Sequence, residues 1–322
     1  ANTPGDAQTL FRITEPGSYY LTSNIAGIAG KSGSEIASSE VSIDLNGFAL
    51  VGVAGSQWGI VATRPSTGFE VRNGAVTGWG GAGVMLSGSL GATVRNVRAS
   101  NNASIGIDGG TGCVIDRCTA TGNVDDGITG GLAATITLCS AYANDGAGIY
   151  TASGCTVTAC TAYANDTNGI DTENGTTVSN CTSYNNQAAG IFAGNGCTIS
   201  GNSCRSNGTD GIRATSTSLV LNNMSSGNGQ AAAGGAGILA NGADNRIEGN
   251  NCCNQDRGVE ITGAGNIIIR NTCSGNTTNW EIAANNFYGP IINRAGVATA
   301  AVSGSSAAET LGSTHPNANF TY

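Results

Sequence analysis

Two acidic residues, Asp171 and Glu173, are separated by a single threonine. If this segment is a β-strand, residues two positions apart point to the same side, roughly 7 Å from each other. That separation suits one carboxylic acid and one carboxylate with a water molecule between them, as in inverting glycoside hydrolysis. We therefore predict a catalytic pair at Asp171 and Glu173, although an ordinary solvated acidic surface would contain the same residues.

Further candidates lie at intervals of 21 residues from Asp171. Tyr150 and Phe192 lie one interval away on either side, Arg213 lies two intervals after, and Asp108 lies three intervals before. If each interval is one turn of a repeating fold, these side chains form one outward column. Aromatic side chains offer apolar area for a sugar ring, so the column predicts substrate-binding residues. The residue types in this column differ from coil to coil, which an unconstrained surface without a function would also show.

Three tyrosines, Tyr142, Tyr163 and Tyr184, follow the same interval of 21 residues. They come directly after small residues that we expect to point inward, so strand alternation places the tyrosines outward. An outward stripe of phenol rings would suit carbohydrate or a partner protein. It would equally suit an aromatic stack that only stabilises neighbouring coils.

Acidic residues also gather at one expected turn, where Asp126, Asp145 and Asp166 follow one another, with Asp125 beside the first. Carboxylates that lie about 5 Å apart repel one another unless a cation or solvent screens them. Ca²⁺ accepts such oxygen ligands, so the first three are the candidate metal ligands. Aspartate also favours turns for local reasons, which is the alternative explanation.

A repeat of 21 residues must position all these side chains. The pairs that mark it are Gly106-Ile107, Gly127-Ile128, Gly148-Ile149, Gly169-Ile170, Gly190-Ile191 and Gly211-Ile212, and asparagines follow the same interval at Asn123, Asn144, Asn165, Asn186, Asn207 and Asn228. A fixed period of this length is typical of a stacked repeat. We expect the asparagines to bond to one another at a turn, the isoleucines to fill the core, and the glycines to occupy corners that need positive φ.

The repeating unit predicts strands rather than helices. Its apolar residues come in short alternating pairs separated by glycine, asparagine, serine and threonine, which is the pattern of strands and turns. The solution is an all-β solenoid in which each coil of about three strands pairs in parallel with the next coil, roughly 4.8 Å away. We predict about eleven coils of this parallel β-helix.

The eleven cysteines follow the repeat as well. Cys118, Cys139, Cys160 and Cys181 occupy one column, which favours stacked thiols in the core over a disulfide framework. Pairing between adjacent coils stays open, because the coil spacing is within disulfide range. The chain has no Cys-x-x-Cys motif and one histidine, His315, which argues against zinc.

Charge and hydropathy exclude some classes of protein. The chain of 322 residues has a formal net charge of −8, and nucleic-acid binding needs basic surfaces instead. No apolar run approaches the length of a membrane span. We expect that a secretory leader has been removed before Ala1, so that the protein is secreted or lies at the cell surface.

The Gly-Ile and Asn repeats, with the segment 41–50 (VSIDLNGFAL), resemble the right-handed parallel β-helix proteins of the pectate-lyase-like superfamily over about residues 15–290. The resemblance implies a right-handed helix and a polysaccharide or cell-surface glycan as partner. Lyases of the pectate type need Arg or Lys beside a Ca²⁺-bound uronate, and only Arg205, Arg213 and Arg246 are placed for that role.

The expected organisation is an N-terminal cap at 1–40, a parallel β-helix at 41–284, and a C-terminal cap and tail at 285–322. The expected function is the binding or processing of a polysaccharide, by a glycoside hydrolase or a lyase if the protein is an enzyme. A non-catalytic structural or adhesive surface protein is the alternative, because the regular repeat and the low content of charged residues favour it as strongly.

Overall fold

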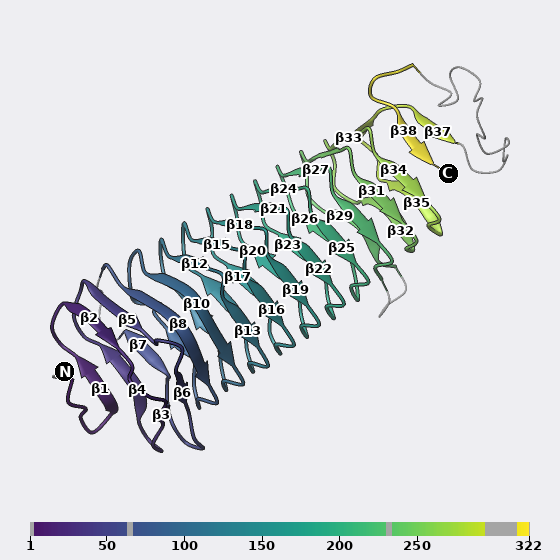
Figure 1. Cartoon of the computed structure of the whole chain (residues 1–322). Helices are drawn as coiled ribbons and strands as arrows, with labels where there is room; N and C mark the ends of the chain where they lie inside the picture. Colours follow the sequence, from purple (N-terminus) through teal and green to yellow (C-terminus); the bar gives the residue numbers. More distant parts are fainter. Residues whose placement is uncertain (1–2, 63–66, 230–233, 294–313, 322) are drawn as a thin grey trace, which may run out of the picture.

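The chain winds as a solenoid of short strands in a computed structural model that describes residues 3–62, 67–229, 234–293 and 314–321 (Figure 1). Each pair of neighbouring strands in this part of the chain is parallel. No described residue lies in a helix, so none belongs to a helix that could cross a membrane. The predicted all-β parallel solenoid is confirmed.

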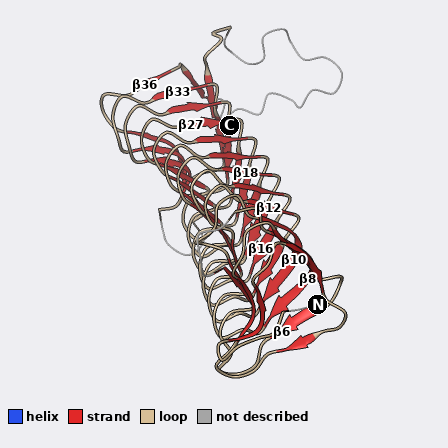
Figure 2. Ribbon diagram, turned by 90° about the vertical axis from the view of Figure 1, so that its left-hand side faces the viewer, coloured by secondary structure: helices blue, strands red, loops and turns tan. Residues whose placement is uncertain are grey.

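Three strand-bearing faces make up the solenoid, joined by tight corners (Figure 2). Face A is a single sheet of 13 strands. In order along the axis they are β1 (Thr9–Ile13), β4 (Ser32–Ile36), β7 (Ile60–Ala62), β9 (Val84–Met85), β11 (Ile107–Asp108), β14 (Ile128–Gly130), β17 (Ile149–Thr151), β20 (Ile170–Thr172), β23 (Ile191–Ala193), β26 (Ile212–Ala214), β29 (Ala236–Ala240), β32 (Arg257–Ile261) and β35 (Thr278–Ile282).

Faces B and C follow face A in every coil. Face B contains β2 (Gly17–Tyr20), β5 (Val41–Asp44), β12 (Val114–Asp116), β15 (Thr135–Thr137), β18 (Thr156–Thr158), β21 (Thr177–Ser179), β24 (Thr198–Ser200), β27 (Leu219–Leu221), β30 (Arg246–Glu248), β33 (Ile267–Ile269) and β36 (Phe287–Tyr288). Face C contains β3 (Ile25–Ala26), β6 (Ala49–Val51), β13 (Thr119–Thr121), β16 (Ser140–Tyr142), β19 (Thr161–Tyr163), β22 (Thr182–Tyr184), β25 (Ser203–Arg205), β28 (Met224–Ser226), β31 (Asn251–Cys253), β34 (Thr272–Ser274) and β38 (Asn319–Thr321), with β37 (Ile291–Asn293) paired to β38. The longer strands β8 (Glu70–Thr77) and β10 (Thr93–Ser100) run through both faces.

The solenoid is longer than the eleven coils expected, because face A contains 13 strands. The additional strands are β1 and β4, which lie before residue 41 and carry no Gly-Ile pair. β1 pairs with β4, and β4 pairs with β7, so the helix already runs through this segment. The division into caps at 1–40 and 285–322 stays a prediction. Residues 294–313 of the C-terminal cap lie outside the described residues.

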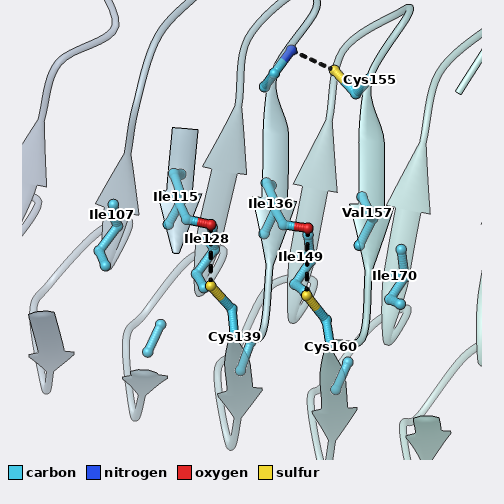
Figure 3. Packing of buried hydrophobic residues seen from close by; sticks show 14 of the residues in the cluster. Ile107, Ile115, Ile128, Ile136, Cys139, Ile149, Cys155, Val157, Cys160 and Ile170 are labelled. Carbon is cyan, nitrogen blue, oxygen red and sulfur yellow. Dashed lines mark hydrogen bonds between the residues drawn. The ribbon is translucent and has the colours of Figure 1, made fainter. Parts of the chain in front are cut away.

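The core consists of inward columns of aliphatic side chains (Figure 3). Face A contributes the isoleucines that follow each repeat glycine, and face B contributes the middle residue of each three-residue strand, such as Ile136 and Val157. All of these are buried. Burial of apolar area stabilises the fold by roughly 25 cal/mol per Å², and the in-register stacking makes each coil support the next.

An asparagine ladder stabilises the corner between face C and face A, as the sequence predicted. Asn144 donates from Nδ2 to Oδ1 of Asn165 at 3.0 Å and to the carbonyl oxygen of Ala120 at 3.2 Å. The same oxygen of Asn165 accepts the backbone N–H of Asn144 at 3.2 Å. Each buried amide therefore satisfies polar groups of the adjacent coils, which would otherwise cost free energy.

The cysteines form a second ladder at the corner between faces B and C. The thiol of Cys139 accepts the backbone N–H of Cys118 at 3.4 Å. It also donates to the carbonyl oxygen of Ile115 at 3.5 Å (Figure 3). Further along the same column Asn202 takes over, and its Oδ1 accepts the N–H of Cys181 at 2.9 Å. All eleven cysteines are free, so the predicted stacked thiols are present, and in this column the thiols of Cys118, Cys139, Cys160 and Cys181 stand where asparagine amides continue the ladder.

The repeat glycines serve a purpose different from the one expected. Those before the isoleucines have no positive φ; a left-handed φ occurs instead at corner residues such as Leu138 (54°) and Ala159 (53°). A Cβ atom added to Gly148 would lie 2.6 Å from Nδ2 of Asn165 and 2.7 Å from the carbonyl oxygen of Gly169. Glycine is therefore needed because the next coil approaches too closely for a side chain.

Candidate functional site

The outward column of face A contains the predicted site residues in the predicted order. Strand pairing places Asp171 between Tyr150 and Phe192 and places Arg213 next to Phe192. Ile170 and Thr172 on either side of Asp171 are buried, so alternation turns Asp171 outward from β20. The rigid core behind the strand thus fixes where this carboxyl group points.

Asp171 is half-buried and held by a neighbour. Its Oδ2 accepts a hydrogen bond from Nδ2 of Asn168 at 2.8 Å. Burial raises the pKa of Asp171, the hydrogen bond from Asn168 lowers it, and repulsion from Glu173 adds to the rise. The pKa is raised overall, which favours the protonated form that a general acid needs.

Glu173 directly follows β20 and is exposed. Its carboxylate accepts hydrogen bonds from the Tyr150 hydroxyl at 2.8 Å and from the Ser153 hydroxyl at 3.1 Å. The hydrogen bond to Glu173 is the main cause that raises the pKa of Tyr150 to about 12, so the phenol stays protonated. Two donors thereby hold the Glu173 carboxylate in one orientation beside Asp171.

Asp126 joins this group, although the sequence assigned it to a metal-binding corner. Its Oδ1 accepts the backbone N–H of Ala147 at 2.7 Å. Burial, and then repulsion from Asp125 and Asp171, raises the pKa of Asp126 to about 6. The sequence contains a sign of this placement. Asp126 comes directly before a repeat glycine, and Asn168, which contacts Asp171, has the same place two coils later.

The pH dependence of stability tests this environment of Asp126. Because its folded-state pKa is about 6 instead of 3.8, the folded chain binds the proton more tightly than the unfolded chain. Its contribution to the free energy of unfolding is therefore present at low pH and lost as the pH rises through about 6. Asp126→Asn should weaken this decrease of Tm with pH. The exposed Asp145→Asn variant is the control, and equal decreases in Asp126→Asn and wild type would contradict the assignment.

In the outward column of face A, two buried polar atoms have no hydrogen-bond partner among the described residues. They are Oγ1 of Thr129, which pairs in register with Tyr150, and Nε of Arg213. Buried polar groups are nearly always hydrogen-bonded, but both atoms have almost no accessible surface, so a ligand on the column would reach them only if their side chains shifted. Asp108 at the start of the column is 8% exposed and accepts the backbone N–H of Gly110 at 3.1 Å. Its carboxyl group is therefore already engaged in a turn.

The tyrosine stripe lies on face C and so does not join the column of Asp171. The ring centroids of Tyr142 and Tyr163 are 4.7 Å apart with planes at 9°, and those of Tyr163 and Tyr184 are 4.9 Å apart with planes at 4°. The rings cover one another's flat faces and present edges and hydroxyl groups outward. A role in binding carbohydrate stays a prediction, and such a ligand would meet ring edges over most of the stripe.

The structure does not bring together the three aspartates predicted to bind Ca²⁺. Asp145 and Asp166 are exposed at the turns that follow face C, whereas Asp126 is half-buried and bonds to the backbone of Ala147. Within the described residues, no group of three or more His, Cys, Asp or Glu side chains is arranged to hold a metal ion. Sequence spacing placed the three aspartates at similar positions, but Asp126 is offset by two residues within the repeat.

Two protein families match the chain. The family described as "Right handed beta helix region" matches residues 26–177, and the one described as "Periplasmic copper-binding protein (NosD)" matches residues 132–293. No curated protein matches the chain in sequence. The first match agrees with the right-handed parallel β-helix of the pectate-lyase-like type that the repeats indicated, and this fold is confirmed.

Solved structures show the same architecture. The A-module of the Azotobacter vinelandii mannuronan C-5 epimerase AlgE4 has 18% identity and a TM-score of 0.67, with 85% of this chain and 91% of that chain covered. The A-module of AlgE6 from the same organism has 17% identity and a TM-score of 0.70, with 84% and 89% covered. The Dettilon tailspike protein has 17% identity and a TM-score of 0.56, with 81% and 59% covered. At these identities the similarity shows a shared fold and nothing about activity.

Proposed function

The chain belongs to the family described as periplasmic copper-binding protein (NosD), whose model matches half of it, and we propose that it binds and processes a polysaccharide along face A. The observation that carries the proposal is the pair Asp171 and Glu173, held by Asn168, Tyr150 and Ser153 on a rigid sheet. The family description supports a place of action outside the cytoplasm.

The proposed reaction is inverting hydrolysis of a glycosidic bond. Asp171 donates its proton to the glycosidic oxygen as the bond from that oxygen to the anomeric carbon breaks. Glu173 accepts a proton from a water molecule, and the oxygen of that water forms the new bond to the anomeric carbon. Roughly 7 Å between side chains two positions apart in an extended segment leaves room for this water.

Each neighbour of the pair has a distinct part in this proposal. The Tyr150 hydroxyl fixes the Glu173 carboxylate through its hydrogen bond of 2.8 Å. Phe192 lies next to Asp171 in strand register and offers an apolar surface to a sugar ring. Arg213 lies next to Phe192 in strand register, and its guanidinium group would bind an acidic or hydroxyl group of the same polysaccharide one coil further on.

Copper is not part of the proposal, because the described residues do not fit it. The core thiols bond to the backbone groups of adjacent coils, as Cys139 does with Cys118 and Ile115. The contact with Cys139 is the main cause that raises the pKa of Cys160 to about 12, which disfavours the thiolate that binds metals. The single histidine accepts the backbone N–H of Asn317 at its Nδ1 atom.

A screen of neutral and uronic polysaccharides with the full chain tests the function. Hydrolysis should release new reducing ends without the ultraviolet absorbance of unsaturated sugars. Unsaturated products would replace hydrolysis by a lyase reaction. If no polysaccharide yields either product, and none retards the protein in affinity electrophoresis, the non-catalytic alternative replaces the proposal.

A further inference from the structure

Face B carries a two-dimensional array of hydroxyl groups in its central part. On β15, β18, β21 and β24 the first and third residues point outward, and each of these residues is threonine or serine. We call this set the hydroxyl array; its members are Thr135, Thr137, Thr156, Thr158, Thr177, Ser179, Thr198 and Ser200. The array uses none of the residues assigned to the polysaccharide site on face A.

The array has a fixed spacing in two directions. Strand register places Thr156 directly beside Thr135 and Thr177, and the other column is aligned in the same way. The separation is therefore about 4.8 Å along the axis and about 6.7 Å across each strand. The hydroxyl groups of Thr158 and Ser179 are 3.0 Å apart, so neighbouring coils also orient one another's side chains.

The backbone and the side chains of the array are held in place. The middle residues of the four strands, Ile136, Val157, Val178 and Ile199, are buried in the core. Threonine is β-branched, which restricts χ1 and limits the directions of its methyl and hydroxyl groups. Binding to an ordered surface would therefore cost little conformational entropy.

The array is also free of charge, in contrast to the ends of the same columns. Asp116 precedes the column of Thr137, and Arg246 and Glu248 follow the array beyond the leucines of β27. Within the array every outward side chain is a hydroxyl, six of the eight with a methyl group beside it. A charged polymer would find no opposite charge on this part of face B.

We propose that the hydroxyl array binds the surface of crystalline ice. Its two spacings lie near repeats of the oxygen lattice in hexagonal ice, so its hydroxyl groups can occupy lattice positions in several coils at once. In one account of the hydrophobic effect, apolar groups restrict the orientations of first-shell water, so the methyl groups between the hydroxyls would favour an ordered water layer. A crystalline polysaccharide is a poorer match, because the apolar faces of its sugar rings would favour contact with flat aromatic side chains, and the array contains none.

Ice-affinity partitioning of the chain of 322 residues tests the proposal. A solution of the protein is frozen slowly on a cold surface, and the protein in the ice is compared with an inert protein of similar size. The wild type should be enriched in the ice and should shape growing crystals. The double variant Thr156→Tyr, Thr177→Tyr places two rings across the centre of the array and should lower the enrichment at least about tenfold.

Thr182→Tyr is the matched control, because it places the same ring at an exposed threonine on face C. It should keep the wild-type enrichment. Circular dichroism of all three proteins shows whether the rings disturb the fold. Exclusion of the wild type from ice, or full enrichment of the folded double variant, would overturn the proposal. Binding to crystalline cellulose or chitin without enrichment in ice would overturn it as well. None of these results depends on activity at Asp171.

Discussion

Ile170→Asp is expected to prevent the central coils from folding. Ile170 is completely buried in β20 and stacks in register between Ile149 and Ile191. An aspartate there would place a charge in an aliphatic column with no polar partner, or remain protonated at a strongly raised pKa. An uncompensated buried charge costs several kcal/mol, which is a large share of the roughly 5–15 kcal/mol that stabilises a typical domain.

Circular dichroism and urea denaturation measure the effect. The variant should lose much of its β signal, or unfold at a far lower urea concentration than the wild type. Ile170→Val is the matched control, since it removes one methylene group and should cost only about 0.5–1.5 kcal/mol. A variant Ile170→Asp with wild-type stability would show that this residue does not lie in the core.

Asp171→Asn, one residue further along the same strand, should leave stability nearly unchanged and abolish turnover. Asp171 points outward and the amide has almost the same shape, so the coil should fold normally. The amide cannot donate the acidic proton to the leaving oxygen, and general acid catalysis contributes about 10²–10⁴-fold to the rate. The measurements are the kcat on a polysaccharide identified by the screen, the Kd for the same polysaccharide, and the Tm.

Glu173→Gln should lower kcat in the same way, because the water molecule would lose its base. Tyr150→Phe distinguishes positioning from proton transfer: it removes the hydroxyl that bonds to Glu173 but keeps the ring. It should lower kcat less than Glu173→Gln and keep the Kd. If Asp171→Asn and Glu173→Gln both keep full activity, the site lies elsewhere, and the stripe at Tyr142, Tyr163 and Tyr184 becomes the next surface to test.

The parts of the fold that the sequence predicted are those that recur once per coil. In-register parallel pairing puts residues 21 positions apart side by side, so the buried isoleucines, the Asn144–Asn165 rungs and the neighbours of Asp171 could be derived from spacing alone. β1 and β4 escaped prediction because they pair in the same way without a Gly-Ile marker. The number of coils was therefore underestimated.

The errors concern the depth and direction of single side chains, which a period does not encode. Asp126 was grouped with Asp145 by nearness in the repeat, but its offset turns it toward Ala147 and Asp171. Gly148 was assigned to a left-handed corner, whereas the distance to the next coil decides its identity. Such contacts depend on how far apart two coils lie at one place, which becomes visible only in three dimensions.

Because a thiol rung can be followed by an amide rung in one ladder, as Cys181 is by Asn202, each coil requires from its neighbour at this corner little more than a hydrogen-bond acceptor. An entire coil could therefore be duplicated or deleted between two rungs without remaking the core. Every such event would lengthen or shorten all three faces by one strand spacing, about 4.8 Å. The solenoid can thus change the length of its faces in equal steps of one coil, while each remaining coil keeps its own outward side chains.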